Sequence, residues 1–186
     1  MTKNQVSHEI SLLDLAISGN ESAFGELYQL NIEKIYTYIF YRTGNKHDAE
    51  DLTSRVFQRA FNHITRYKKT NVPFSAWLYR IAHNLVANWY RDSKRRKEVP
   101  IEDHGYLPEK SDLPEKQIEK KQEVEGLLRM IHKLSNDRQT LILLKYVEDL
   151  SNKEIGLIMG KSEGAIKSLY HRTLNELREN GDKKIK

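Results

Sequence analysis

The sequence contains no cysteine and has only 4 prolines and 9 glycines among its 186 residues. Without cysteine, neither a disulfide framework nor a metal site with thiolate ligands can form. The longest uninterrupted aliphatic run covers residues 141–144, far short of the ~20 residues that cross a bilayer. The first residues also lack the apolar core of a signal peptide. We therefore expect a soluble protein of the cytoplasm, without membrane insertion.

Residue patterns that carry catalysis are absent as well. The 7 histidines never fall four residues apart or beside another metal ligand at a known spacing. The sequence has neither a glycine-rich phosphate loop nor the nucleophile elbow of a hydrolase. The acids that follow His47 are explained by a helix N-terminus, whose dipole favours negative charge. We expect a protein that is not an enzyme and that binds neither a metal nor a cofactor.

Charge is distributed unevenly along the chain, although the net charge is only +5. Residues 55–97 contain 11 Lys and Arg side chains and a single acid, Asp92. Residues 98–125 are acidic, and residues 126–186 are basic again. Two basic zones on either side of an acidic spacer predict two places that hold a polyanion such as DNA. Solvated helix faces are the alternative, but they do not account for the near absence of acids in the first zone.

Three of the 4 prolines lie between residues 99 and 115, together with a glycine and many acids. A helix cannot continue through such a stretch. We therefore predict an all-α protein with two small domains, residues 1–97 and 116–186, joined by a flexible linker over residues 98–115. Such a linker spans at most ~60 Å when fully extended, so the two domains can lie well apart.

Apolar residues recur at helical spacing throughout the first domain and predict four helices. These cover residues 8–18, 20–43 and 45–64, followed by a helix that starts at Pro73 and runs into the basic residues 94–97. Asn45 is placed to cap the third helix, with Asp48 at the capping-box position, and the apolar stripe of that helix includes Phe61. The fourth helix buries a stripe that includes Trp77. Its other face is polar and mostly basic, with Arg80, His83, Asn84, Asn88 and Arg91.

The second domain is predicted to begin with a charged helix over residues 116–133. The next helix is expected to start at Ser135 as its cap, and its apolar side chains are Leu141, Leu144, Tyr146 and Val147. Ser151 and Glu154 form a capping box for a short helix, and Gly160 supplies a tight turn. Ser162 caps the last helix. In that helix the inward stripe consists of Ile166, Tyr170, Thr173 and Leu177.

Residues 150–177 thus have the pattern of a helix-turn-helix, in which a short capped helix and a turn place a second helix in the DNA major groove. The outward face of that second helix carries Gly164, Lys167, Ser168, His171 and Arg172. Lys, His and Arg suit base edges or phosphates, and Ser suits phosphates. A helical hairpin used only for packing is the alternative, but it gives no reason for so few acids on this face.

Three blocks together resemble bacterial RNA polymerase sigma factors of the small extracytoplasmic-function group. They are residues 48–53 (DAEDLT), 73–84 (PFSAWLYRIAHN) and 162–168 (SEGAIKS). Sigma factors of this group have only the conserved regions called two and four, and the resemblance covers nearly the whole chain in the right order. It implies a protein that binds core polymerase, recognises the −35 and −10 promoter motifs, and assists duplex opening. The polymerase itself carries out the catalysis.

The resemblance also implies partners and the surface that meets them. The partners are core polymerase, through its β′ clamp and β flap, promoter DNA, and an anti-sigma protein. The helix that follows Asn45 resembles the surface that grips the β′ clamp. Its candidate residues are Asp48, Asp51, Ser54, Arg55 and Gln58.

The basic loop over residues 66–71 resembles the element that captures a flipped base of the −10 motif. Its candidate residues are Arg66, Tyr67, Lys68, Lys69 and Asn71. An aromatic ring stacks on a base, lysines neutralise phosphates, and an amide hydrogen-bonds a base edge. Further side chains would hold the adjoining duplex, namely Arg80, Asn84, Asn88 and Arg91. The −35 motif would be read by Ser162, Gly164, Lys167, Ser168, His171 and Arg172.

Some positions depart from the family pattern. Ser54-Arg55 stands where the family often has Gln-Glu, and Leu169 and Leu174 stand where Arg is common. Gly156 replaces the usual Ala, which is expected to weaken its helix by up to ~1 kcal/mol.

The alternatives to a sigma factor are a stand-alone helix-turn-helix regulator and an all-helical adaptor that binds only protein. The regulator has no need of the basic loop followed by Trp77. The adaptor has no need of the first basic zone.

Overall fold

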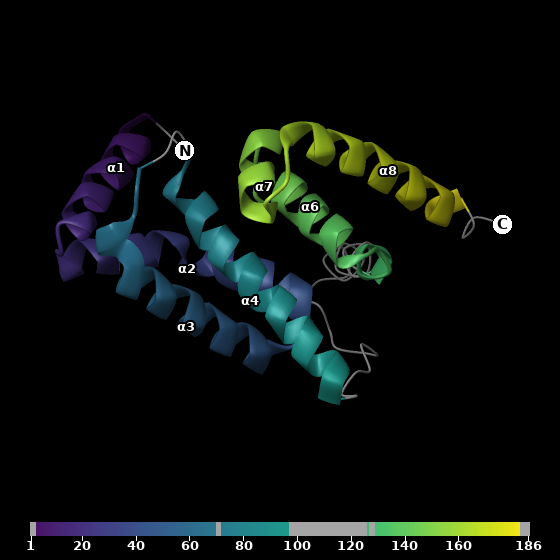
Figure 1. Ribbon diagram of the computed structural model, residues 1–186, viewed down its shortest axis with the longest axis horizontal. Coiled ribbons are helices and arrows are strands. Elements are labelled where there is room, and N and C mark those ends of the chain that lie inside the picture. The colour runs from purple at the N-terminus through teal and green to yellow at the C-terminus, as the bar shows by residue number, and fades with distance from the viewer. Residues whose placement is uncertain (1–2, 70–71, 97–125, 127–128, 183–186) are drawn as a thin grey trace, which may run out of the picture.

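The computed structural model describes residues 3–69, 72–96, 126 and 129–182, and all regular structure in these ranges is helical (Figure 1). The first group of helices comprises α1 (Lys3–Ile17), α2 (Glu21–Thr43), α3 (Lys46–His63), the 3-10 helix η1 (Ile64–Arg66) and α4 (Phe74–Arg96). The second group comprises α6 (Asn136–Tyr146), α7 (Asn152–Met159) and α8 (Glu163–Asp182). The all-α prediction is therefore confirmed. The predicted linker and most of the predicted helix at 116–133 lie outside the described residues.

The helices of the first group begin and end where capping chemistry places them. The Asn20 side chain accepts a hydrogen bond from the Ala23 amide at 2.9 Å, and the Asn45 side chain accepts one from the Asp48 amide at 3.1 Å. Gly44 ends α2 with a φ of 65°, in the left-handed region that favours glycine. Caps of this kind satisfy backbone groups that a helix end leaves unpaired.

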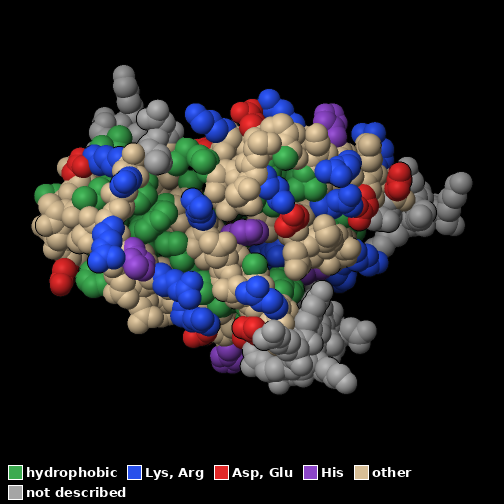
Figure 2. Space-filling model, in the orientation of Figure 1, with side chains coloured by type: hydrophobic (Ala, Val, Ile, Leu, Met, Phe, Trp, Pro, Cys, Tyr) green, Lys and Arg blue, Asp and Glu red, His purple; other side chains and the backbone are tan. Residues whose placement is uncertain are grey.

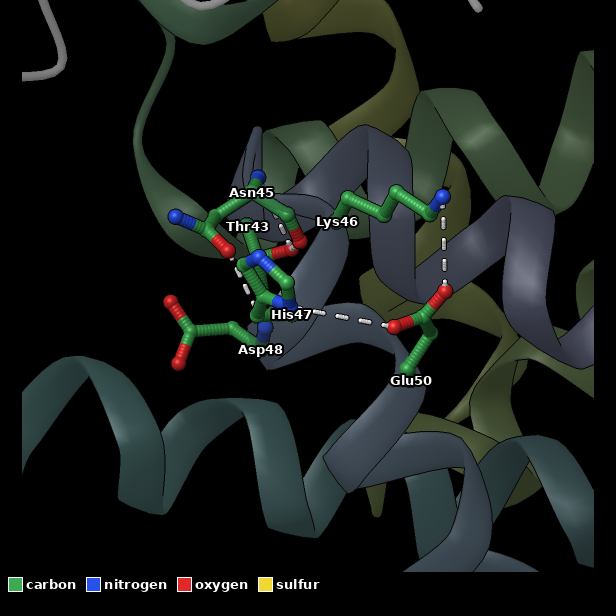
Figure 3. A network of polar contacts seen from close by, with 6 residues as sticks. All are labelled: Thr43, Asn45, Lys46, His47, Asp48 and Glu50. Carbon is green, nitrogen blue, oxygen red and sulfur yellow. Dashed lines mark hydrogen bonds and ion pairs between the residues drawn. The ribbon is translucent and has the colours of Figure 1, made fainter.

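The capping box expected at Asn45 is only half formed. In Figure 3 the Asp48 carboxylate points away from Lys46 and Glu50, and no hydrogen bond from it to the cap backbone occurs in the described part of the chain. Glu50 instead lies 3.9 Å from both the Lys46 ammonium and the His47 ring. The box prediction was wrong for Asp48, which leaves its carboxylate available to a partner.

The core of the first group is formed by the predicted apolar stripes. Leu27, Ile35 and Ile39 of α2 have no exposed surface, and α2 packs against α1, α3 and α4. Phe61 is an exception, because 43% of its surface is exposed beside a groove between α2 and α3. Its assignment to the core was wrong, since the stripe of α3 extends beyond the area that α2 covers.

The second group has the expected helix-turn-helix. The Ser151 side chain accepts from the Glu154 amide at 3.3 Å, and the Glu154 carboxylate accepts from the Ser151 amide at 2.7 Å, so this capping box is complete. Gly160 has a φ of 65°, and the Ser162 side chain accepts from the Ala165 amide at 3.2 Å. These local signals are confirmed.

The helix before it differs from expectation in two respects. Ser135 stands at the cap position of α6, but its side chain makes no capping hydrogen bond among the described residues. Tyr146 and Val147 are 60% and 48% exposed, because α6 ends at Tyr146 and the chain turns away from the core there. Neither belongs to the buried stripe.

Close packing explains why position 156 is a glycine, which helix propensity alone does not. It is buried, and a Cβ added there would lie 2.6 Å from the carbonyl oxygen of Lys161, where the chain turns from α7 into α8. The Lys161 amide also donates to the Gly156 carbonyl at 2.8 Å. Glycine therefore permits the close turn of the helix-turn-helix, and the expectation of a weakened helix misses this contact.

We predict that Gly156→Ala lowers the free energy of unfolding by about 1–3 kcal/mol, the usual cost of overpacking, although alanine favours helices. Gly25→Ala is the matched control, because Gly25 lies exposed in α2 with open space around its Cβ position. The control is expected to be neutral or to gain up to ~1 kcal/mol. Equal stabilities of the two variants in urea denaturation would contradict the packing argument.

The two helical groups pack against each other, with α4 against α7 and α2 against α6 (Figure 1). One hydrophobic cluster runs through both groups, from Leu12 in α1 to Ile166 in α8. Tyr79 of α4 is 1% exposed although it lies off the predicted apolar stripe, because this side of α4 faces the second group. The two halves lie in contact in this structure, an arrangement that the predicted length of the linker also permits.

Candidate nucleic-acid interface

The basic loop after α3 and the start of α4 surround a small cavity of about 330 Å³. An aromatic wall is formed by Tyr67, whose ring centroid lies 4.8 Å from that of Trp77 and 5.8 Å from that of the buried Phe74. The remaining side chains around the cavity are His63, Arg66, Lys68, Val72, Ala76, Arg80 and Leu157. The cavity therefore combines flat aromatic surface with three permanent positive charges.

This combination suits a nucleobase with its phosphates. Aromatic rings stack on any base, and arginine and lysine neutralise the backbone that carries it. The structure brings together the predicted residues Arg66, Tyr67, Lys68 and Arg80. Trp77, assigned to the buried stripe by its spacing, is only partly buried and lines the same cavity. His63 was missed, since nothing in the local sequence relates the end of α3 to this cavity.

Lys69 and Asn71 do not join this group. Lys69 forms an ion pair with Asp14 of α1, and both side chains remain about half exposed. Asn71 lies outside the described residues. A phosphate that contacts Lys69 would therefore compete with Asp14, an interaction of the exposed kind that contributes ~0–1 kcal/mol.

The polar face of α4 continues from the cavity along the helix. Asn84, Asn88 and Arg91 are exposed, and Arg91 donates a hydrogen bond to the side chain of Asn88. Figure 2 shows Lys and Arg side chains gathered over this side of the first group, with acidic side chains mostly at its edges. The predicted duplex-facing residues thus form an open, basic strip.

The outward face of α8 is open as well. Lys167, Ser168, His171 and Arg172 are exposed, and so is Gly164. The Arg172 Nε donates to the Ser168 carbonyl at 3.3 Å, which orients the guanidinium. The Lys167 ammonium lies 2.8 Å from Glu163, and this hydrogen bond and charge lower the pKa of the Glu163 carboxyl. Ser162 uses its hydroxyl oxygen as the helix cap.

The two leucines that depart from the family pattern in α8 are both partly buried. Leu169 packs against the hydrophobic cluster, so an arginine there would have to leave a packed environment to reach DNA. Among the residues predicted to face DNA on α8, Lys167 and Arg172 carry permanent positive charges.

Two of the five candidate residues for polymerase binding lie at a groove of about 600 Å³ between α2 and α3. Ser54 and Gln58 line it, whereas Arg55 forms an ion pair with Asp51 at 3.6 Å and Asp48 lies at the start of α3. The groove is lined by four aromatic side chains, two acids, and four other side chains. The lining consists of Tyr28, Ile32, Glu33, Tyr36, Glu50, Thr53, Ser54, Phe57, Gln58 and Phe61.

Sequence reasoning missed the aromatic walls of this groove. Tyr28 and Phe57 pack edge to face with centroids 4.7 Å apart, and Phe24 and Phe61 do so at 5.2 Å. The helical spacing of Phe57 and Phe61 can be read from the sequence. That spacing is equally consistent with burial inside the first group of helices and with an open surface. Only the pairing of α2 with α3 shows that one edge of this aromatic row stays open to a partner.

The fold is all-helical, and it has a helix-turn-helix and a basic aromatic cavity of the kind expected in a DNA-binding protein. Comparison with known proteins specifies the class. The protein-family model of sigma-70 region 2 matches residues 27–96, and the protein-family model of sigma-70 region 4 matches residues 125–177. The chain belongs to the sigma-70 family, in its extracytoplasmic-function (ECF) group.

Named relatives agree with this assignment. The ECF RNA polymerase sigma factor SigW of Bacillus subtilis is 31% identical, over 87% of this chain and 90% of SigW. The ECF RNA polymerase sigma factor BldN of Streptomyces coelicolor is 36% identical over 90% of this chain, which spans 64% of the length of BldN.

Solved structures show the same fold. CnrH in complex with the cytosolic domain of CnrY has a TM-score of 0.71 at 20% identity, over 94% of this chain and 97% of that one. RpoE of Bartonella quintana, in complex with the anti-sigma factor NepR, has a TM-score of 0.68 at 21% identity, over 84% of this chain and 94% of that one. In the described part of the chain, no helix is long and apolar enough to cross a membrane.

Proposed function

We propose that this chain is a sigma factor that binds core RNA polymerase, recognises −35 and −10 promoter motifs, and assists the opening of the duplex. The observation that carries the proposal is that one chain has two different surfaces whose side chains are suited to DNA. The exposed face of α8 suits duplex DNA, and the cavity beside Tyr67 and Trp77 suits an unpaired base. The chain supplies recognition, and the polymerase supplies the chemistry.

The DNA contacts divide by the form of DNA that each can hold. Lys167, His171 and Arg172 read the −35 duplex, with Gly164, Ser162 and Ser168 allowing close approach or contacting phosphates. A base flipped from the −10 motif stacks in the cavity, where Tyr67 provides a ring and Arg66, Lys68 and Arg80 provide charge. Lys69 and Asn71 belong to the same loop. The strip with Asn84, Asn88 and Arg91 holds the neighbouring duplex.

Polymerase binding is assigned to the groove between α2 and α3 and to the exposed polar residues of α3. The β′ clamp would place apolar side chains in the aromatic groove and meet Asp48, Asp51, Ser54, Arg55 and Gln58 around it. The second group would contact the β flap. Buried aromatic anchors within a polar rim are the usual source of binding energy at protein interfaces. The same groove is suited to an anti-sigma protein, as expected from relatives solved with anti-sigma partners.

The residue assignment predicts that Phe61→Ala weakens binding to core polymerase about tenfold or more, because truncating a hot-spot side chain at an interface costs ~2 kcal/mol or more. Ile10→Ala is the matched control, since Ile10 is 50% exposed in α1 and does not line the groove. Titration of fluorescent core polymerase with each protein measures the affinities. Identical affinities for the two variants would remove the groove from the interface.

The function itself is tested by in vitro transcription with core polymerase of the source bacterium on fragmented genomic DNA. We expect new transcripts whose start sites share two upstream motifs at a constant spacing. A stand-alone regulator would bind duplex fragments without polymerase and yield no new transcripts. An adaptor would do neither. Either result would overturn the proposal.

A further inference from the structure

The first helix, α1, belongs to neither of the surfaces assigned to DNA, yet it contacts the basic loop that leads to the cavity. The match to sigma-70 region 2 begins at residue 27, so α1 lies before the matched part of the chain. Its buried face consists of Leu12, Leu13 and Ala16, which belong to the same hydrophobic cluster as Ile64 of η1. The helix packs against both α2 and η1 (Figure 1). It therefore supports the point at which the basic loop leaves α3.

A second contact joins α1 to the loop beyond η1. The Lys69 ammonium forms an ion pair with the Asp14 carboxylate, and these side chains are 45% and 58% exposed. Residues 55–97 contain one acid of their own, Asp92, so the negative charge at Lys69 is supplied by a distant segment. The preceding residue, Lys68, lines the cavity, whereas Lys69 is not among the lining residues. Two neighbouring lysines of the loop therefore have different contacts, one with the cavity and one with α1.

The start of the loop is held by packing and the next residues by the ion pair. The Tyr67 ring packs against Phe74 and Trp77 of α4, and the Tyr67 amide donates to the Ile64 carbonyl at 3.0 Å. Residues 67–69 belong to no helix. Such a segment loses conformational entropy when it binds a ligand, and a restraint that already exists in the free protein reduces that cost. The ion pair to α1 is a restraint of this kind.

We propose that α1 is a support for the −10 loop and that Asp14 is a positioning residue. Asp14 holds Lys69 on α1, which keeps Lys68 directed at the cavity beside Tyr67. The proposal rests on the assignment of this cavity to a base of the −10 motif. In this arrangement Lys69 acts on α1, and the phosphates are neutralised by the basic side chains that line the cavity.

The charge of Asp14 is tested with Asp14→Asn in the reconstituted holoenzyme, on a promoter with a fluorescent base analogue in the −10 motif. We expect opening about two- to fivefold slower, within the range that an exposed ion pair can supply, and unchanged binding to closed duplex. Glu26→Gln is the matched control. Glu26 is 57% exposed and lies 3.7 Å from His8, so this variant removes an ion pair between α1 and α2 that does not involve the loop. Faster opening by Asp14→Asn would mean that Asp14 only competes with phosphate for Lys69, and it would overturn the proposal, as would equal rates for the two variants.

Exchange of the two charges separates positioning from phosphate contact. Asp14→Lys and Lys69→Asp each place like charges side by side, so each is expected to slow opening more than Asp14→Asn does. The double variant restores an ion pair of reversed polarity and should recover most of the wild-type opening rate. A lysine that neutralised phosphate could not be replaced by an acid in this way. A double variant that opens the duplex no faster than the single variants overturns the proposal.

Hydrogen exchange in the full chain without polymerase tests the support independently of transcription. The amides of residues 66–69 are expected to exchange about two- to fivefold faster in Asp14→Asn than in the wild type, because the lost restraint is local. The Glu26→Gln control should exchange at the wild-type rate there. Unchanged exchange of these amides in Asp14→Asn overturns the proposal. If exchange rises as expected but neither the wild type nor any variant supports transcription, the proposed function fails and the support of the loop by α1 stands.

Discussion

Arg172→Ala is expected to weaken binding of the reconstituted holoenzyme to the −35 motif by about 5- to 150-fold, with core-polymerase affinity unchanged. A side chain that reads bases contributes ~1–3 kcal/mol of discrimination. Arg172 is exposed, and its contact with the Ser168 carbonyl orients it before DNA arrives, so little ordering is needed on binding. Its importance is increased because Leu169 and Leu174 supply no charge on this helix. Electrophoretic mobility shifts on promoter fragments with and without the −35 motif measure the effect.

Arg129→Ala is the control for the loss of a positive charge. Arg129 is also exposed and belongs to the second half of the chain, but it precedes α6 rather than lying on α8. It is expected to change promoter affinity much less than Arg172→Ala does, because salt screens an exposed charge that lies away from the DNA. If both variants lose the same affinity on both fragments, then Arg172 acts only through general electrostatics, and its role in reading the motif is wrong.

Tyr67→Ala is expected to slow open-complex formation by about 5- to 150-fold while changing binding to closed duplex only slightly. Stacking of a base on an aromatic ring contributes ~1–3 kcal/mol, and this energy is available only after a base has left the helix. The Tyr67 ring already packs against Phe74 and Trp77, so it is positioned before the base arrives. A fluorescent base analogue in the −10 motif, observed by stopped flow, measures the opening rate.

Two further measurements separate stacking from loop integrity. Tyr67→Phe keeps the ring and is expected to retain most of the opening rate. A template with a pre-opened −10 bubble should recover part of the activity lost by Tyr67→Ala, because the cost of unpairing is removed. A loss of duplex binding as large as the loss of opening would show that Tyr67 supports the loop structurally and captures no base.

Arg172 and Tyr67 lie on two surfaces, and the sequence predicted the residues of the first more completely than those of the second. The α8 face was predicted residue by residue, because a helix displays its surface with a fixed period and Ile166 and Thr173 mark the buried side. The cavity beside Tyr67 was predicted only as a basic aromatic loop. Trp77 and His63 enter it because α4 passes beside the end of α3, and helical spacing gives no information on such a crossing.

The polymerase-binding assignment shows the same limit. The charged and polar residues of α3 were identified through the family resemblance, and the sequence placed Phe61 in the core. The groove lies between α2 and α3, where Tyr28 and Phe57 line it and Phe61 stays partly exposed. A stripe of apolar residues predicts that a face will be covered, but it does not say whether the same chain or a partner covers it.

By itself, the sequence determined the helix-turn-helix, its caps and the exposed face of its second helix, as well as the helical class and the order of the elements. These features depend on hydrogen bonds and side-chain spacings within a few residues, such as the reciprocal bonds of Ser151 and Glu154. Only the tertiary structure decided that Gly156 must lack a Cβ, that a groove with aromatic side chains stays open between α2 and α3, and that Leu157 lines the cavity beside Tyr67. Each of these involves atoms from segments that meet only when the helices pack, as Arg42 and Asn136 do across 94 residues. Such contacts depend on where two helices cross, and the spacing of residues within one helix does not predict that crossing point.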